Sequence, residues 1–154
     1  MDAAKIEAIV KGMENFGGIF DAHQLADVKI LDLPISLIVN TGEHWISIYI
    51  DKENFEIMDS VGLAAEENFD KHLCRFICAH LYGKKFTATP KLQNDNSSIC
   101  GKFAVTFIFY RAFTSKSLKA FTSIFSENFE ENEKILEEIF KTITKLSTEF
   151  SRKK

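Results

Sequence analysis

Several residue types that mark particular protein classes are scarce in this 154-residue sequence. Only 7 glycines and 2 prolines are present, which excludes collagen-like repeats, long linkers and low-complexity segments. Three cysteines are too few, and odd in number, for a disulfide framework, so we expect the thiols to be reduced. No apolar run approaches the roughly 18 residues that suggest a membrane span. The net charge of −3 gives no electrostatic footprint for nucleic acid.

The first residues also lack the basic-then-apolar order of a secretory signal peptide. Together with the reduced thiols, this predicts an intracellular protein. An apolar content of 45%, with 15 phenylalanines, is enough to build a real core at this length. We therefore expect one domain over residues 1–154 that is monomeric and contacts no membrane.

Apolar periodicity divides the chain into helices and strands in an α+β order. Residues 45–50 alternate, with Ile46, Ile48 and Ile50 on one side, which is typical of a strand. Short turns on both sides of this segment predict three consecutive antiparallel strands, at 35–40, 45–50 and 55–58, and a further strand is predicted at 85–89. Helices are predicted at 3–14, 63–82, 118–125 and 128–150, with a polar connection at 21–33.

The most apolar segment follows a polar, turn-forming run. Residues 103–110 are almost continuously apolar, which predicts a helix that is buried on most of its faces. Ser97 and Ser98 are the predicted N-caps, so Cys100 lies in or beside the first helical turn. The positive end of the helix dipole favours a thiolate there, and Cys100 is therefore a candidate nucleophile.

A cysteine nucleophile needs a base, a group that orients the base, and donors for the oxyanion of the tetrahedral intermediate. His44 opens one predicted strand and Asp59 follows the next strand of the same hairpin, so the two side chains can meet at one end of the sheet. Gln93 lies seven residues before Cys100, in the loop that leads into the helix. Its side-chain amide and the backbone N–H of Cys100 would make a two-donor oxyanion hole.

These residues fall into three motifs, Gly42-x-His44-Trp45, Phe55-x-x-Met58-Asp59-Ser60-x-Gly62 and Gln93-x6-Cys100-Gly101. Together the motifs resemble the adenain-type cysteine peptidases. This is the adenovirus-protease branch of the wider group that includes the ubiquitin-like-protein (Ulp/SENP-like) proteases. The resemblance covers about residues 5–113. It implies a papain-like α+β architecture, with the cysteine helix packed on a small, mainly antiparallel sheet between flanking helices.

Carried over position by position, the resemblance implies Cys100 as nucleophile, His44 as general base and then acid, Asp59 as its orienting group and Gln93 as oxyanion donor. Trp45 would wall a narrow substrate cleft, to which Gly42 and Gly101 of the same motifs would contribute. Members of the family cut polypeptides next to small residues, commonly after glycine. The expected activity is that of a thiol endopeptidase that matures structural precursors of a virus or virus-like element. Such an enzyme would act in the host nucleus or cytoplasm or be packaged in the virion.

Three features of the adenovirus branch are not matched. The adenovirus enzymes can be activated by a peptide tethered to a cysteine upstream of the glutamine, and by DNA. Residues 79–92 contain no cysteine and the chain is acidic, so the sequence supports neither an activating peptide nor a nucleic acid. The adenovirus enzymes also carry Glu where this chain has Asp59, whereas the ubiquitin-like proteases carry Asp. We expect no cofactor.

Two alternative functions stay open. The chain could process or deconjugate a ubiquitin-like modifier, or it could be a catalytically inactive module of the same fold that binds peptides. A metal site is not expected. His72, Cys74, Cys78 and His80 are close in sequence, but one helix cannot direct all four side chains at a single tetrahedral ion.

Overall fold

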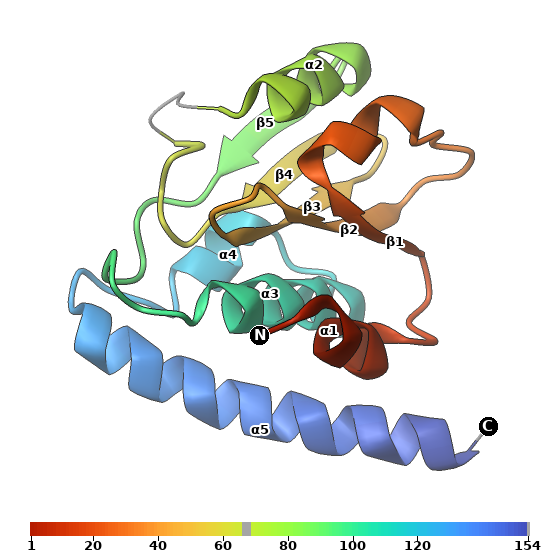
Figure 1. The fold of residues 1–154 in the computed structure, drawn as a ribbon. Coiled ribbons are helices and arrows are strands. Elements are labelled where there is room, and N and C mark those ends of the chain that lie inside the picture. The colour runs from red at the N-terminus through yellow and green to blue at the C-terminus, as the bar shows by residue number, and fades with distance from the viewer. Residues whose placement is uncertain (66–68, 154) are drawn as a thin grey trace.

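The computed structural model describes residues 1–65 and 69–153, with side chains up to residue 149, and builds them around one five-stranded sheet. The helix α2 (Lys71–His80) and the short 3-10 helix η1 (Ala22–Asp27) cover one face of the sheet (Figure 1). The other face carries α3 (Cys100–Thr114), with α1 (Ala3–Val10) and α4 (Leu118–Thr122) beside it. The long helix α5 (Phe129–Lys153) forms an outer layer under α3 and α1. This is the predicted α+β architecture.

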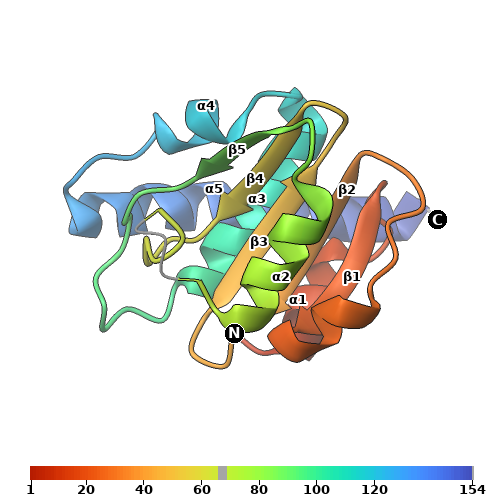
Figure 2. The ribbon, with the colours of Figure 1, turned by 90° about the horizontal axis from the view of Figure 1, so that it is seen from above.

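The sheet has the strand order β1-β2-β3-β4-β5 (Figure 2). The three central strands are antiparallel, as predicted: β2 (Ile35–Asn40), β3 (Trp45–Ile50) and β4 (Asn54–Met58). The edge strands β1 (Phe16–Asp21) and β5 (Lys85–Ala88) are parallel to their neighbours. The sheet is therefore mixed, because the connections that carry η1 and α2 return the chain to the end of the sheet at which the previous strand began.

Strand β1 and helix η1 were not predicted, and α1 ends at Val10 rather than at residue 14. The sequence around β1 contains Gly17 and Gly18, which reads as a helix stop. In the structure, the register of β1 against β2 shifts between Phe16 and Gly18, and Gly17 lies against the side chains of Ile35 and Leu37. A Cβ atom at Gly17 would come within 2.7 Å of Leu37, so the glycine permits a close strand approach.

The alternation of β3 divides the core into two sides. Ile46, Ile48 and Ile50 pack with α2 and η1 on one face. The neighbouring Trp45 and Tyr49 pack with the helices on the opposite face. The catalytic-helix candidate α3 therefore lies directly on β3, with its side chains buried on nearly all sides, as predicted from its apolarity.

Helix α2 begins at Lys71, so the prediction of a helix over 63–82 was too long. Asp70 is its N-cap and accepts hydrogen bonds from the backbone N–H groups of His72 and Leu73. Ala64 instead donates its N–H to the Asp59 carboxylate at 2.9 Å, which holds this part of the chain in a turn around Asp59. The remaining part of the prediction, residues 66–68, lies outside the described residues.

The predicted caps of α3 were also wrong. Ile99 occupies the N-cap position and makes no side-chain capping bond. Ser97 is used in the preceding turn, where its N–H donates to the Asn94 carbonyl and its own carbonyl accepts from Gln93. Cys100 is the first residue of α3, as the sequence suggested.

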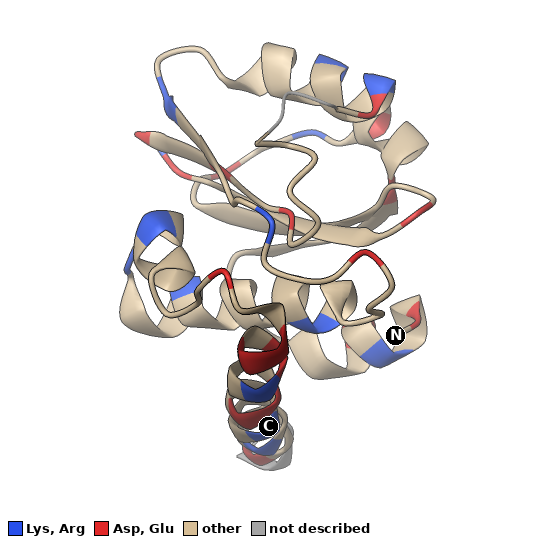
Figure 3. Cartoon of the chain, turned by 90° about the vertical axis from the view of Figure 1, so that its left-hand side faces the viewer, with Lys and Arg blue, Asp and Glu red and all other residues tan. Residues whose placement is uncertain are grey.

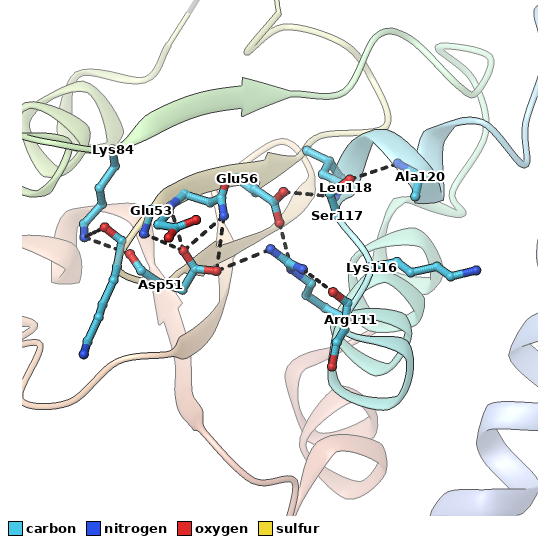
Figure 4. A network of polar contacts seen from close by, with 12 residues as sticks. Asp51, Glu53, Glu56, Lys84, Arg111, Lys116, Ser117, Leu118 and Ala120 are labelled. Atoms are coloured by element: carbon cyan, nitrogen blue, oxygen red, sulfur yellow. Dashed lines mark hydrogen bonds and ion pairs between the residues drawn. The ribbon is translucent and has the colours of Figure 1, made fainter.

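A buried network fixes the far end of α3 to the sheet (Figure 4). Arg111 Nε lies 3.0 Å from Glu56 Oε1 of β4, and the guanidinium stacks over the Tyr49 ring at 4.1 Å. Glu56 Oε2 accepts from the backbone N–H of Leu118 at 3.0 Å, and Asp51 approaches Arg111 at 3.5 Å. Burial raises the pKa of Glu56 above its ordinary value, although the Leu118 N–H and Arg111 oppose the shift.

Acidic and basic residues are both present along α5, which begins with the acidic Glu130 and Glu131 (Figure 3). None of the described helices combines the length and the apolarity needed to cross a bilayer.

Candidate active site

The hairpin of β3 and β4 brings His44 and Asp59 together. His44 immediately precedes β3 and Asp59 immediately follows β4, and antiparallel pairing places these two points at the same end of the sheet. His44 Nε2 lies 3.1 Å from Asp59 Oδ1. This is the pairing that the sequence order suggested for a base and its orienting acid.

Asp59 is 3% exposed, and its carboxylate is surrounded by donors. Besides His44, the N–H groups of Val61 and Ala64 donate to it at 3.1 and 2.9 Å. The Thr89 hydroxyl accepts from the Asp59 N–H and donates to its carbonyl, both at 2.8 Å. Burial alone would raise the pKa of Asp59, but the bonds from His44, Ala64 and Val61 outweigh it and hold that pKa below its usual value. Asp59 is therefore a fixed negative charge at neutral pH.

Cys100 is half-buried at the start of α3, where the helix lies against the start of β3. The backbone N–H of Trp45 donates to the Cys100 sulfur at 3.4 Å. Gly101 allows this approach: a Cβ at position 101 would lie 3.4 Å from the Trp45 ring and 3.2 Å from Met1. An N–H group and a helix N-terminus both favour negative charge on the sulfur.

Cys100, His44 and Gln93 line one cleft of about 480 Å³. Across the described ranges, no hydrogen bond links the Cys100 sulfur to the His44 ring. The ring nitrogen that does not face Asp59, Nδ1, lies 3.2 Å from the hydroxyl of Thr41. Asp59 therefore holds Nε2, and Nδ1 is hydrogen-bonded to Thr41 rather than to Cys100.

Gln93 is 2% exposed, and both ends of its amide are held. Its Oε1 accepts from the Ser60 hydroxyl, and its Nε2 donates to the Ser97 carbonyl at 2.9 Å. An amide nitrogen carries two protons, so one N–H is left for an acceptor in the cleft.

Of the three residues predicted to bind substrate, two line the cleft and one lies beneath it. Trp45 and Gly42 line the cleft. Gly101 is buried beneath the Trp45 ring instead, where it permits close packing. The Trp45 indole is fixed by a hydrogen bond from its Nε1 to the Met1 carbonyl at 2.9 Å. Gly42 has a φ of +97°, which favours glycine in the turn before His44.

Sequence reasoning missed the residues that orient the site rather than react. Thr41 contacts the His44 ring, Ser60 holds Gln93, and Met1 walls the cleft beside Trp45. Ser60 belongs to the motif that follows β4, which is a usable signal. Thr41 and Met1 carry none, because a threonine in a turn is common.

No group of three or more His, Cys, Asp or Glu side chains in the described part of the chain could hold a metal ion. Cys74 and Cys78 are free and exposed on α2.

A thiol, an imidazole with an anionic partner, and an amide donor around one cleft are the groups required for acyl transfer through a thioester. The sulfur can attack a carbonyl carbon, the imidazole can move a proton, and the amide N–H can meet the oxygen that becomes negative.

One solved structure supports this fold, and two more show a weaker likeness. The central domain of the uncharacterized Lpg1148 protein from Legionella pneumophila superposes with a TM-score of 0.56 at 12% identity, covering 97% of this chain and 98% of that one. A de-sumoylating protease gives a TM-score of 0.48 at 16% identity, covering 94% and 77%. AvrA delL154 with IP6 and CoA gives 0.48 at 14% identity, covering 84% and 53%.

No curated protein matches this sequence. The model of the Ulp1 protease family, C-terminal catalytic domain, matches residues 2–145, which is nearly the whole chain. The chain therefore belongs to the Ulp1 protease family and is a cysteine peptidase.

Proposed function

We propose that this peptidase hydrolyses the bond after a small residue of an extended polypeptide, with Cys100 as nucleophile. The observation that carries the proposal is the convergence of Cys100, Gln93 and the Asp59-bonded His44 on one cleft. The cysteine thiolate attacks the scissile carbonyl carbon, and the carbonyl oxygen becomes an oxyanion that accepts from Gln93 and the Cys100 N–H.

His44 then donates its proton to the leaving nitrogen as the carbon–nitrogen bond breaks, which leaves an S-acyl enzyme. A water molecule gives one proton to His44 and attacks the thioester carbon. The carbon–sulfur bond breaks, and the carboxylic acid and the thiolate are released. Asp59 stays ionised throughout and stabilises the imidazolium.

The preference for small residues is supported by the fixed position of Trp45. Its indole is held by Met1 and packs over Gly101, so it cannot swing aside to admit a large side chain next to Cys100. Glycine is the residue that best fits between such a wall and the nucleophile.

Two substrate classes follow for the same chemistry. The motifs around His44, Asp59 and Cys100 resemble the adenain type, which supports maturation of structural precursors of a virus or virus-like element, inside a host cell or virion. The Ulp1 family match supports processing or deconjugation of a ubiquitin-like modifier. Both classes of substrate present a small residue before the scissile bond.

Cleavage assays separate the two classes. A ubiquitin-like modifier with a Gly-Gly tail fused to a reporter is offered beside an unfolded polypeptide containing Gly-Gly and Gly-Ala sites, with Cys100→Ala as control. Cleavage of the polypeptide at rates similar to the fusion supports precursor maturation. Efficient cleavage of the folded fusion alone supports modifier processing and rules out maturation.

Thiol labelling tests catalytic competence against the inactive-module alternative. Iodoacetamide should modify Cys100 at least about tenfold faster than the exposed Cys74 and Cys78, because the Trp45 N–H donates to the Cys100 sulfur and His44 lines the same cleft. His44→Ala should remove most of that advantage. Equal rates at all three thiols, or no effect of His44→Ala, would show a binding module. Cys100→Ser should abolish turnover while the unfolding midpoint stays within a few degrees.

A further inference from the structure

We propose that Thr41 is a positioning residue for His44, whose hydroxyl changes from hydrogen-bond donor to acceptor as the imidazole gains its proton. The inference rests on the proposed role of His44 as general base and acid. It concerns the ring nitrogen that exchanges the proton, which Asp59 does not reach.

The turn that connects β2 and β3 wraps the Thr41 hydroxyl around His44. Thr41 Oγ1 lies 3.2 Å from Nδ1 of the ring, 3.1 Å from the His44 carbonyl oxygen and 3.3 Å from the His44 backbone nitrogen. The backbone N–H of Thr41 also donates to the His44 carbonyl at 3.0 Å. Gly42 closes the turn by donating to Asn40 Oδ1 at 2.8 Å. The hydroxyl is therefore fixed by the backbone of the residue whose ring it contacts.

Counting protons decides what this hydroxyl can do. The Asp59 carboxylate only accepts, so Nε2 of His44 carries a proton in both charge states of the ring. In neutral His44, Nδ1 is bare, and the Thr41 hydroxyl must donate to it. In the imidazolium, Nδ1 carries a proton, and the hydroxyl must accept.

The hydroxyl proton of Thr41 has a second acceptor nearby, the backbone carbonyl of His44. When Thr41 accepts from Nδ1, its own proton can turn to the His44 carbonyl at 3.1 Å. A rotation about one bond thus keeps every donor and acceptor of the turn satisfied in both states. A valine of the same shape has no such contact, and an asparagine or glutamine could not change roles without flipping its amide.

The hydrogen bond between Thr41 and His44 is stronger when the ring is charged. A hydrogen bond from a charged donor is roughly twice as strong as one between neutral groups. Thr41 therefore stabilises the imidazolium more than the neutral ring. Nδ1 has a single in-plane position for a proton, so its bond to Thr41 opens when the proton passes to the leaving nitrogen, and Thr41 acts on the ring between the two proton transfers. Thr41 is hydrogen-bonded to His44 and not to Cys100, so it acts through the imidazole.

The other ionisable groups near His44 are the same in the wild type and in every Thr41 variant. Besides Asp59, four ionisable residues line the two pockets beside the His44 ring. They are Cys100 at the start of α3, Glu43 in the turn before β3, Asp70 at the N-cap of α2 and Asp95 in the loop before α3. Because none of them is altered, a change in the titration of His44 reports the hydroxyl.

The test compares Thr41→Val, Thr41→Ser and a matched control, Thr106→Val. The Thr106 hydroxyl is buried in α3 with no hydrogen-bond partner among the described residues, so its loss should leave the pH profile unchanged. We expect Thr41→Val to lower kcat about three- to tenfold with KM nearly constant. The alkaline limb of kcat/KM should move down by about half a pH unit or more, because the imidazolium loses an acceptor. Thr41→Ser should restore both values.

A second readout does not depend on turnover. The NMR titration of the His44 ring in isotopically labelled protein should shift to lower pH in Thr41→Val and return in Thr41→Ser. A loss of kcat with an unmoved alkaline limb and an unmoved His44 titration would reduce Thr41 to a structural role and overturn the proposal. If the wild type cleaves no substrate, the proposed function fails. The Thr41 inference is then still decided by comparing the NMR titration of His44 in the wild type and in the Thr41 variants.

Discussion

Gln93 offers the sharpest test of the proposed chemistry, because the structure fixes how many donors its loss removes. One of its two Nε2 protons is used by the Ser97 carbonyl, and Oε1 is used by the Ser60 hydroxyl. Only one N–H can therefore meet the oxyanion. Loss of a single oxyanion donor costs about 10²–10³ in kcat, or about 2.7–4 kcal/mol in the transition state.

We therefore expect Gln93→Ala to lower kcat by about 10²–10³ while KM changes less than about threefold, because a neutral carbonyl accepts only weakly. Ser60→Ala should cost less, about three- to tenfold, since it frees one end of an amide that Ser97 still holds. In the double variant, Ser60→Ala should add nothing to Gln93→Ala, because Ser60 acts only through Gln93.

The assay measures kcat and KM from initial rates on an internally quenched Gly-Gly peptide for the four proteins of this cycle. Gln93→Ala also leaves the buried Ser60 hydroxyl without this partner, at about 1–3 kcal/mol, so urea unfolding must confirm that each variant is folded under assay conditions. A Gln93→Ala kcat within about threefold of wild type would refute the oxyanion role. Additive losses in the cycle would show that Ser60 acts elsewhere.

Two further predictions concern stability. Hydrogen bonds depress the pKa of Asp59, so its stabilising effect is complete above the ordinary carboxyl pKa of 3.8 and is lost as pH falls through the lower native value. The gap in unfolding free energy between wild type and Asp59→Asn should therefore close as the pH falls below about 4 in urea titrations; a gap that widens below that pH would contradict this. Arg111→Met should cost about 3–5 kcal/mol because it leaves Glu56 buried without its cation, with side chains only 7% and 2% exposed. The control Lys141→Met breaks a pair that is 71% and 78% exposed and should change unfolding by less than about 1 kcal/mol, so equal effects of the two variants would refute the argument.

The parts of the fold that could be predicted from sequence are those whose signals are local. The alternation of residues 45–50 and the short turns beside them were enough to place His44 and Asp59 at one end of a hairpin. The long apolar segment was enough to identify α3 and to place Cys100 at its start. In both segments the secondary structure favoured by the local sequence is also the one that the tertiary packing stabilises.

The parts that failed depend on distant partners. Strand β1 carries two glycines and pairs in parallel with β2 across the η1 connection, so nothing within its own sequence indicates a strand. The helical pattern of residues 63–82 continues before Lys71, but the Asp59 carboxylate uses the Ala64 N–H and keeps that segment in a turn. Likewise, Ser97 is not the cap of α3, because it lies two residues before the N-cap Ile99, in a turn where its carbonyl accepts from Gln93. Tertiary contacts with the site replaced the local preference at both places.

The same dependence explains how Cys100 and His44 are kept in register. Trp45 follows His44 directly in the chain, and its N–H donates to the Cys100 sulfur. Its ring also packs over Gly101, so the first turn of α3 is tied to the residue next to His44. Arg111 ties the last turn of the same helix to the sheet. Because α3 is held at both ends against β3 and β4, any shift of the helix must move Cys100 relative to His44, and a change that loosens either end should reduce kcat before it unfolds the protein.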